Sequence, residues 1–560
     1  MNLISLKPAW RAFQHKPLIL VLIIAASIRI IFLYADAPAA DMSRSGDFLA
    51  DEGTWANNAL NWALTGKWYI PNGYNPGVSS PVFMLFDFVL LKIFGISLYA
   101  LRIGGVLCSL VSLYFFHLII TSNSFPGHNP PQPNEAIGRG ATLPMLLAAT
   151  NFPLIIFNRL AFLENLLICF LLWAAYSLMR YLRGEGKPYW LASCWLSIFA
   201  GYWTKPSIMF FVLVMIGLIC YYQLKRRRSF ISISVAMCII FIVGVVSWKS
   251  YYPQDSQCFY QINILSRISF DPVVIIKSYA QYIGHLKFYE FMPITYSLAI
   301  WMLLYSIKNK ENCASKLPPV AVLWSIWLMV GILFFGFFAY SPPRYSLTLV
   351  LPICGLAGYF FSDTVATNLP QKRYIPLFII ALLQCFFGYY RFSSLNQRYA
   401  SIFYPLLGLL TVVMLFIFFD QPQRIKWIKR SLLLAILLLQ SAQIFNYYLH
   451  REYSLFTAME QVSQIIHHEK KSNVIIAGDS AMIMALHAKT RAIDIVFCSD
   501  NLPLLVSELK PQYLFLEDPD ELTRLKDQLP AYWANAQPLF STKLMHNYLH
   551  GKNAVFYKIE

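Results

Sequence analysis

Residues 17–34 read PLILVLIIAASIRIIFLY, an apolar run that follows the basic residues Lys7, Arg11 and Lys16. Its 18 residues are close to the length that a helix needs to cross a bilayer. Basic residues before a first span favour a cytoplasmic start. We therefore predict a retained first transmembrane helix with the N-terminus in the cytoplasm.

The composition of the whole chain is also strongly apolar. Of its 560 residues, 57% are hydrophobic and only 13% are charged, and the mean hydropathy is +0.51. A soluble protein would need about twice this charged fraction to cover its surface. The ten cysteines are scattered without a CxxC pair, which excludes a disulfide-stapled domain. The sequence predicts a multi-spanning α-helical membrane protein.

The spacing of apolar runs predicts 12 further spans. Residues 81–94 are apolar but too short for a span, so we interpret them as an interfacial or re-entrant segment. With this choice every basic cluster falls on the cytoplasmic side, at 180–187, 225–228, 308–316, 372–373 and 424–430. The result is about 13 helices, with the N-terminus inside and the C-terminus outside. The expected spans are 98–120, 140–157, 165–182, 188–204, 206–223, 230–249, 293–307, 318–340, 344–361, 374–390, 399–419 and 431–450.

The net charge of +17 would suggest nucleic acid if the protein were soluble. Residues 451–560, however, hold 11 basic and 13 acidic residues, so the positive excess belongs to the membrane portion. It is therefore a signal of topology, and we expect no nucleic-acid partner.

The composition changes after residue 450. Strand-like stretches at 473–477, 492–497, 513–517 and 554–559 alternate with amphipathic helical ones. We predict two domains: residues 1–450 form the membrane domain, with a first outer loop at 35–80, and residues 451–560 form a small α/β domain outside the membrane.

Carboxylates near a membrane are costly and so are candidates for function. Asp51 and Glu52 are adjacent in the first outer loop, and neighbouring side chains do not share one helix face, which favours a single catalytic carboxylate. The alternative is a helix start stabilised by acidic residues. Glu164 falls on the same predicted membrane side as Asp51. It is either part of a site or the partner of Arg159 in a structural ion pair.

Several cations lie at predicted outer positions, where loop cations are under-represented. They are suited to a lipid-linked phosphate, although each one alone also fits a side chain that reaches lipid headgroups. His285 fits a phosphate donor, a metal ligand or a plain loop histidine. The cations are Lys67, Arg102, Lys205, Lys287 and Arg344.

In chain order these residues resemble the GT-C glycosyltransferases that use polyprenyl-phosphate-linked sugars, especially the bacterial aminoarabinose transferases of lipid A and the protein O-mannosyltransferases. Two positions depart from the pattern: Glu164 stands where the family has Asp, and residues 74–80 lack the lysine of the aminoarabinose enzymes. The matching segments are 51–53 (Asp-Glu-Gly), 66–71 (Gly-Lys-Trp-Tyr-Ile-Pro), 94–102 (Phe-Gly to Arg), 163–164 (Leu-Glu), 204–206 (Thr-Lys-Pro) and 344–345 (Arg-Tyr).

The resemblance implies an inverting transfer of a sugar from a polyprenyl-phosphate donor, such as an undecaprenyl-phosphate sugar, on the outer face of a bacterial inner membrane. Asp51 would be the general base, with Glu164 and Glu52 as further catalytic candidates. The donor phosphate would be bound by Arg344, Lys205, Lys67, His285 and Arg102. The acceptor would be lipid A, another glycolipid, a glycan or a protein. No metal is required, although carboxylates and His285 leave a divalent ion possible.

Three alternatives belong to other classes. A transporter or flippase of lipid-linked saccharides would carry charges near the centres of its spans, whereas here they gather at one face. An O-antigen polymerase or ligase would carry its large outer loop between late spans. A sensor domain on a membrane anchor would not need thirteen spans.

Overall fold

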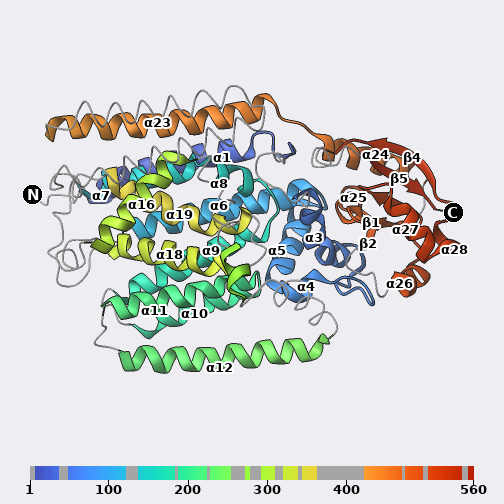
Figure 1. Ribbon diagram of the computed structural model, residues 1–560, viewed down its shortest axis with the longest axis horizontal. Helices are drawn as coiled ribbons and strands as arrows, with labels where there is room; N and C mark the ends of the chain where they lie inside the picture. The colour runs from blue at the N-terminus through green and yellow to red at the C-terminus, as the bar shows by residue number, and fades with distance from the viewer. Residues whose placement is uncertain are drawn as a thin grey trace, which may run out of the picture.

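The computed structural model describes residues 7–36, 48–121, 136–182, 187–222, 227–253, 271–277, 292–308, 319–337, 343–361, 422–469, 473–495, 502–544 and 553–559. A bundle of long helices forms one end of the molecule, and a mixed sheet with short helices forms the other (Figure 1). The bundle helices are α1 (Lys7–Ile30), α6 (Leu98–Thr121), α7 (Ala136–Ala149), α8 (Phe152–Asn158), α9 (Leu163–Arg180), α10 (Pro188–Tyr202), α11 (Phe210–Tyr222), α12 (Arg227–Tyr251), α16 (Pro293–Lys308), α18 (Pro319–Gly336), α19 (Leu347–Phe361) and α23 (Pro422–Leu449).

Within the described ranges, six helices are long and apolar enough to cross a membrane. They are Leu98–Thr121, Leu163–Arg180, Phe230–Tyr251, Pro319–Gly336, Arg344–Phe361 and Lys429–His468, the last of which continues beyond α23. Shorter apolar helices cover Pro17–Ile30, Pro206–Tyr222 and Ile294–Leu303. The expected spans at 374–390 and 399–419 lie outside the described residues, so the total of about 13 stays a prediction.

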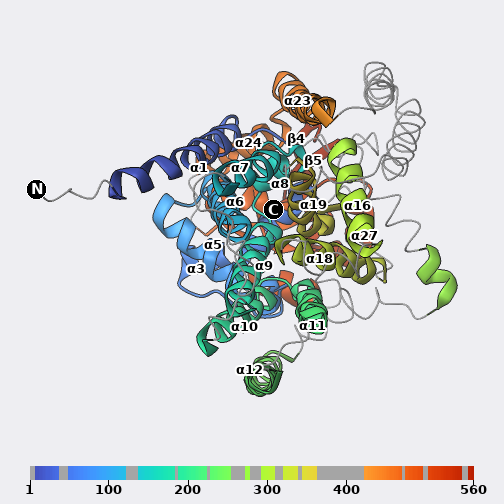
Figure 2. The ribbon, with the colours of Figure 1, turned by 90° about the vertical axis from the view of Figure 1, so that its left-hand side faces the viewer.

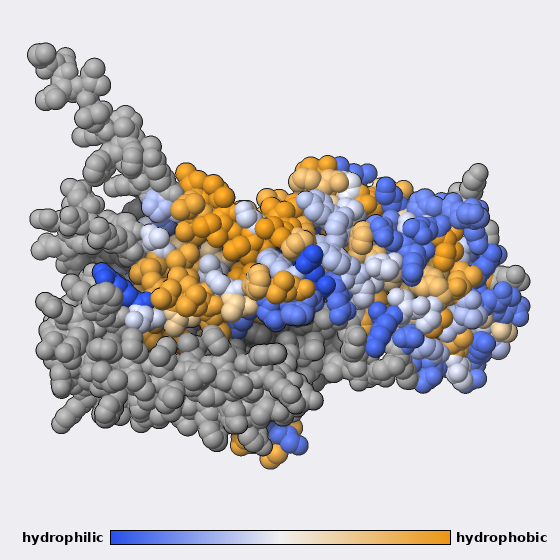
Figure 3. All heavy atoms as spheres, turned by 90° about the horizontal axis from the view of Figure 1, so that it is seen from above, coloured by the Kyte–Doolittle hydropathy of each residue, from blue (hydrophilic) through white to orange (hydrophobic). Residues whose placement is uncertain are grey.

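Helix α9 packs against both α6 and α10. Helices α18 and α19 pack against each other and belong to the same hydrophobic core. Helix α12 differs from these core helices, because only 6% of its apolar segment within Phe230–Tyr251 is buried. Seen along the bundle, α12 stands at the periphery (Figure 2). Most of its exposed large apolar side chains are aliphatic, as on a surface that faces lipid. Apolar side chains dominate the helical part of the face shown in Figure 3, and polar ones dominate the other end.

Three further helices lie between the bundle and the sheet: α3 (Phe48–Thr65), α4 (Pro76–Ser79) and α5 (Pro81–Phe94). Prolines stand at the first positions of α4 and α5, where a missing N–H costs nothing. Gly66 and Gly95 follow α3 and α5 with φ of 77° and 83°, a conformation that suits glycine. The predicted separate segment at 81–94 is therefore present as a helix with those bounds.

The C-terminal part contains a five-stranded sheet of order β2-β1-β3-β5-β4. Strands β1 (Ile475–Gly478), β2 (Arg491–Asp494) and β3 (Tyr513–Leu516) are parallel, whereas β5 (Ala554–Lys558) is antiparallel to β3 and to β4 (Gln537–Thr542). The helices of this part are α24 (Ser454–His468), α25 (Ala481–Ala488), α26 (Leu502–Leu509), α27 (Glu521–Gln528) and α28 (Pro530–Trp533). The four predicted strands overlap β1, β2, β3 and β5, and β4 is the strand that the sequence did not indicate.

The two parts share a hydrophobic core. Ala56, Ala59 and Leu60 of α3 belong to the same buried cluster as Ile483 and Met484 of α25. The chain leaves α23 at Leu449 and enters α24 at Ser454. The helix that carries Asp51 is thus packed directly against the C-terminal part.

Candidate active site

Four of the residues singled out from the sequence meet in one place, although they come from four distant segments. Asp51 lies in the first turn of α3 and Glu164 in the first turn of α9. Lys205 directly precedes the short 3-10 helix η2 (Pro206–Met209), and Arg344 lies in η4 (Pro343–Ser346). We call these four residues the charged cluster. All four stand at helix ends, where backbone geometry leaves side chains free to converge.

Ion pairs join the charged cluster into a chain. Nη1 of Arg344 pairs with Oδ2 of Asp51, and Nε of Arg344 lies 3.6 Å from Oε1 of Glu164. Nζ of Lys205 donates to the same Glu164 oxygen. The Glu164 side chain is 2% exposed, whereas those of Lys205, Arg344 and Asp51 are 15%, 16% and 19% exposed. Glu164 therefore forms the buried floor, and the other three residues line an accessible surface.

Aromatic rings support the two cations of the cluster. Nζ of Lys205 lies 3.9 Å from the ring centroid of Tyr345, and the guanidinium carbon of Arg344 lies 5.7 Å from that of Phe162. A cation over a ring face gains about 0.5–2 kcal/mol, depending on its exposure. The rings thus hold the cations beside the carboxylates and away from bulk water.

The local sequence explains part of this placement. Pro206 disfavours helical geometry at the preceding residue, and Lys205 is extended with φ −158° and ψ 122°. Phe162 is also extended just before α9, which puts Glu164 at the helix start where the dipole favours a carboxylate.

The structure corrects two expectations, for Glu52 and Arg102. Both side chains are fully buried and form a bidentate ion pair, with Nε to Oε1 at 3.0 Å and Nη2 to Oε2 at 2.7 Å. Arg102 also donates to the carbonyl oxygens of Leu33 and Ala35, and Glu52 accepts from the N–H of Ala161. A guanidinium committed in this way has no face left for a donor phosphate, and Glu52 has no free oxygen edge for chemistry.

Lys67 and Arg159 do not join the charged cluster. Lys67 is exposed beyond the other end of α3, about 21 Å from Asp51 along the helix axis. His285 and Lys287 lie outside the described residues. Arg159 does not pair with Glu164 in the structure: it donates to the carbonyl of Phe32 and packs on Tyr447 and Tyr448. The structural ion pair considered for Arg159 and Glu164 is therefore wrong.

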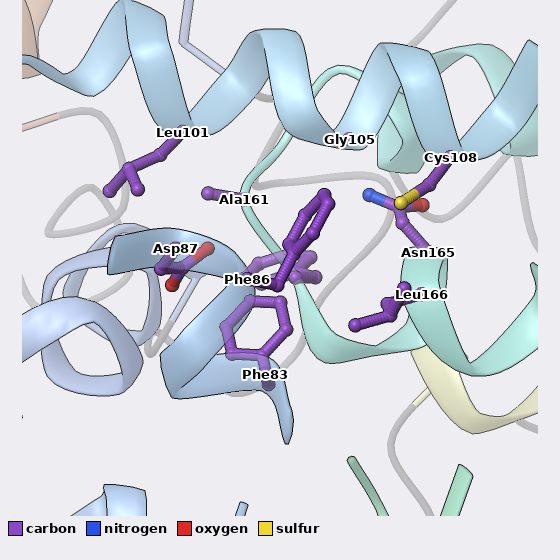
Figure 4. Close-up of a pocket in the computed structure, with 10 residues that line it drawn as sticks. Phe83, Phe86, Asp87, Leu101, Gly105, Cys108, Ala161, Asn165 and Leu166 are labelled. Atoms are coloured by element: carbon purple, nitrogen blue, oxygen red, sulfur yellow. The ribbon is translucent and has the colours of Figure 1, made fainter. Parts of the chain in front are cut away.

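Phe162 also lines a small pocket, and Figure 4 shows how other lining side chains lie around it. Its lining is mostly apolar and comes from α5, α6 and the start of α9: Phe83, Phe86, Asp87, Leu101, Gly105, Cys108, Ala161, Phe162, Asn165 and Leu166. Asp87 is 1% exposed, and its Oδ2 has no hydrogen-bond partner in the described structure. Asp87 was not among the residues expected from the sequence, although one Asp inside an apolar helix is a recognisable signal.

Metal binding has no support in the described part of the chain. No group of three or more His, Cys, Asp or Glu side chains lies close enough there to hold an ion.

Solved structures share this architecture. The chain aligns with ArnT from Cupriavidus metallidurans in the apo state with a TM-score of 0.60 and 13% identity, covering 99% of this chain and 98% of that chain. The same protein bound to undecaprenyl phosphate gives a TM-score of 0.60 and 13% identity over 96% and 97% of the two chains. The chain has the GT-C fold.

At this identity the likeness establishes the GT-C fold and no more. An oligosaccharyltransferase from Archaeoglobus fulgidus, in complex with Zn and sulfate, aligns with a TM-score of 0.42 and 11% identity over 90% of this chain and 68% of that chain. The sequence matches no protein-family model. Comparison with curated proteins gives no match either.

Proposed function

We propose that the protein is an inverting glycosyltransferase that moves a sugar from a polyprenyl-phosphate donor to an acceptor on the outer face of the membrane. The observation that carries the proposal is the charged cluster, in which a partly exposed carboxylate, Asp51, lies beside two partly exposed cations, Arg344 and Lys205. This is the set of groups that the transfer needs: a base for the acceptor and cations for the phosphate.

The reaction is a single displacement. Asp51 takes the proton from an acceptor hydroxyl as the oxygen attacks the anomeric carbon of the sugar. The bond between that carbon and the phosphate oxygen breaks, and the polyprenyl phosphate leaves with the electron pair. Arg344 and Lys205 stabilise the charge that develops on the leaving phosphate.

In this proposal Glu164 is a positioning residue. It is almost fully buried and contacts both cations, so it holds their side chains at one spacing without reaching solvent. The reach of a glutamate suits this bridging role. Lys67 and Arg102 drop out of the proposed phosphate site because of their distance and burial respectively.

The polyprenyl nature of the donor is supported by the shared fold, because one of the aligned ArnT structures is bound to undecaprenyl phosphate. The outer location rests on the distribution of basic residues, which predicts an inner-membrane protein with a cytoplasmic N-terminus, about 13 spans and a periplasmic C-terminal domain. The acceptor class remains lipid A, another glycolipid, a glycan or a protein.

The test is transfer of label from a radiolabelled undecaprenyl-phosphate sugar to membrane acceptors. We expect Asp51→Asn to lower transfer on the order of 100-fold or more, as for loss of a general base. Asp527→Asn, at an exposed position of α27, is the matched control and should keep full activity. Full transfer by Asp51→Asn removes this residue from the chemistry. No transfer by the wild type with any polyprenyl-phosphate sugar overturns the proposed function.

A further inference from the structure

The C-terminal domain touches the chain two residues from Asp51. A Cβ atom placed on Gly53 would lie 2.3 Å from the backbone nitrogen of Ile483 in α25 and 2.6 Å from its Cα. These atoms belong to a helix backbone, which cannot move aside as a side chain does. Glycine at position 53 therefore permits α25 to pack directly on the first turns of α3.

A second contact joins the domain to the segment after α1. The Asp36 side chain is 2% exposed, and its Oδ2 accepts from the N–H of Ser454 at 2.6 Å and from the Ser454 hydroxyl at 2.7 Å. Ser454 is the first residue of α24, so this carboxylate satisfies a free N–H at the helix start and complements the dipole. Asp36 thus ties the beginning of the C-terminal domain to the membrane domain.

The Asp36 contact continues inward through buried polar groups. The carbonyl oxygens of Leu33 and Ala35 accept from Nη1 of Arg102 at 2.7 and 3.1 Å. Arg102 holds Glu52, the neighbour of Asp51 along α3. Glu52 also accepts from the N–H of Ala161 at 2.8 Å, three residues before Glu164. Buried hydrogen bonds and short stretches of backbone therefore connect α24 to Glu52, beside Asp51, and to Ala161, three residues before Glu164.

We propose that docking of the C-terminal domain, through α25 against Gly53 and through Asp36 at the start of α24, positions Asp51 and Glu164 for catalysis. This inference rests on the proposed function. The residues involved are positioning residues, because none of them contacts the accessible face of the charged cluster. The domain is in this view a structural part of the active site.

Docking has a readout that does not depend on activity. Arg451 lies in the connection between α23 and α24, where its guanidinium packs 3.8 Å from the ring centroid of Phe32 and its Nε donates to the Tyr453 hydroxyl. Release of α24 would expose this site to trypsin. The rate of cleavage after Arg451 in the purified full-length chain therefore measures how firmly the domain is docked.

The first variant is Gly53→Ala, with Gly244→Ala as the matched control. Both glycines lie inside helices, but a Cβ at Gly244 meets nothing within 4 Å. We expect Gly53→Ala to speed cleavage after Arg451 and to lower kcat on the order of 100-fold, as for a small misplacement of a catalytic group. The KM for the donor should change less than kcat, because Gly53 shares its helix with Asp51, whereas Lys205 and Arg344 stand on other segments. Gly244→Ala should match the wild type in both assays.

Asp36→Ala and Asp36→Asn provide an independent test if Gly53→Ala fails to fold. Alanine removes the acceptor for Ser454 and should act as Gly53→Ala does, whereas asparagine keeps one acceptor oxygen and should restore most of kcat. Faster cleavage with an unchanged kcat would overturn the positioning role. Unchanged cleavage in both Gly53→Ala and Asp36→Ala would overturn the docking contacts. A wild type without transfer is a different result, which defeats the proposed function and this proposal with it.

Discussion

Arg344 bridges the two carboxylates of the charged cluster. Its Nη1 pairs with Asp51 while its Nε faces Glu164, so the planar guanidinium uses two edges at once. A lysine ammonium is a point charge and cannot reproduce this geometry. The Arg side chain is therefore part of the arrangement and not only a source of charge.

We accordingly expect Arg344→Lys to lower kcat/KM for the donor about 10-fold or more, because the charge is retained but one ammonium cannot face both carboxylates as the guanidinium does. The measurement is the initial rate of label transfer over a range of donor concentrations. Arg524→Lys, in an exposed pair with Glu521 on α27, is the control and should leave the rates unchanged. Equal rates for Arg344→Lys and wild type would contradict a role for the guanidinium shape.

A second prediction at this scale concerns Asp479, which follows β1. Burial, and then the charge of Glu517, raises the pKa of Asp479 from 3.8 to about 8. Between these pH values the folded domain keeps a proton that the unfolded chain releases, so folding grows less favourable as pH rises toward 8. The loss is complete above the folded pKa.

Asp479→Asn cannot ionise and should unfold at a higher temperature than wild type above about pH 8, by about 4 °C or more. The difference should shrink toward acidic pH. Thermal unfolding of the full-length protein at several pH values is the measurement. A constant difference across the pH range would contradict the assignment.

At the scale of the element, helix α5 contains one buried carboxyl group, that of Asp87. Asp87 lies on its buried side without a hydrogen bond to Oδ2, and burial raises its pKa well above the ordinary range of an aspartate. A buried polar atom without a partner costs about 1–3 kcal/mol. The residues that line the pocket beside it are mostly apolar.

Asp87→Leu should therefore raise the apparent Tm of the purified protein, by relief of about 1–3 kcal/mol. Asn165→Leu in the same pocket is the contrasting variant and should lower it, because Nδ2 of Asn165 donates to the carbonyls of Phe157 and Leu160. Destabilisation by Asp87→Leu would indicate that Asp87 has a partner or a function that its surroundings do not explain.

Elements differed in how far their sequences predicted them. The helix at 81–94 and strands β1, β2, β3 and β5 follow from apolar patterning bounded by proline, glycine and polar turns. Strand β4 was missed because its side chains are mostly exposed, it lies at the sheet edge and it contains Pro538. An edge strand has little hydrophobic pattern to reveal it.

For the whole molecule, the predictable part of the site was the convergence of its residues, and the side of the membrane on which they lie stays a prediction. Asp51, Glu164, Lys205 and Arg344 were expected on one membrane face, and the structure brings them into contact. The sequence did not predict that Glu52 and Arg102 neutralise each other, because a pair 50 residues apart is set by the packing of α3 on its neighbours. Nor did it predict that Lys67 lies just beyond the far end of α3 and away from the cluster.

The predicted orientation is testable on the whole chain. Alkaline phosphatase fused after Glu560 should be active, because that enzyme folds only outside the cytoplasm, whereas a fusion after Arg226 should be inactive. The opposite pattern would place the charged cluster on the cytoplasmic side, where nucleotide sugars are available, and would remove the main argument for a lipid-linked donor.

The ion pair between Asp51 and Arg344 also has a kinetic consequence. While the pair is intact, the base is occupied and a water molecule that enters the site meets a neutralised carboxylate. A donor phosphate that binds Arg344 frees Asp51 at the moment when a sugar is present to be transferred. In the proposed mechanism we therefore expect ordered binding with the donor first, and free polyprenyl phosphate should inhibit competitively against the donor and noncompetitively against the acceptor.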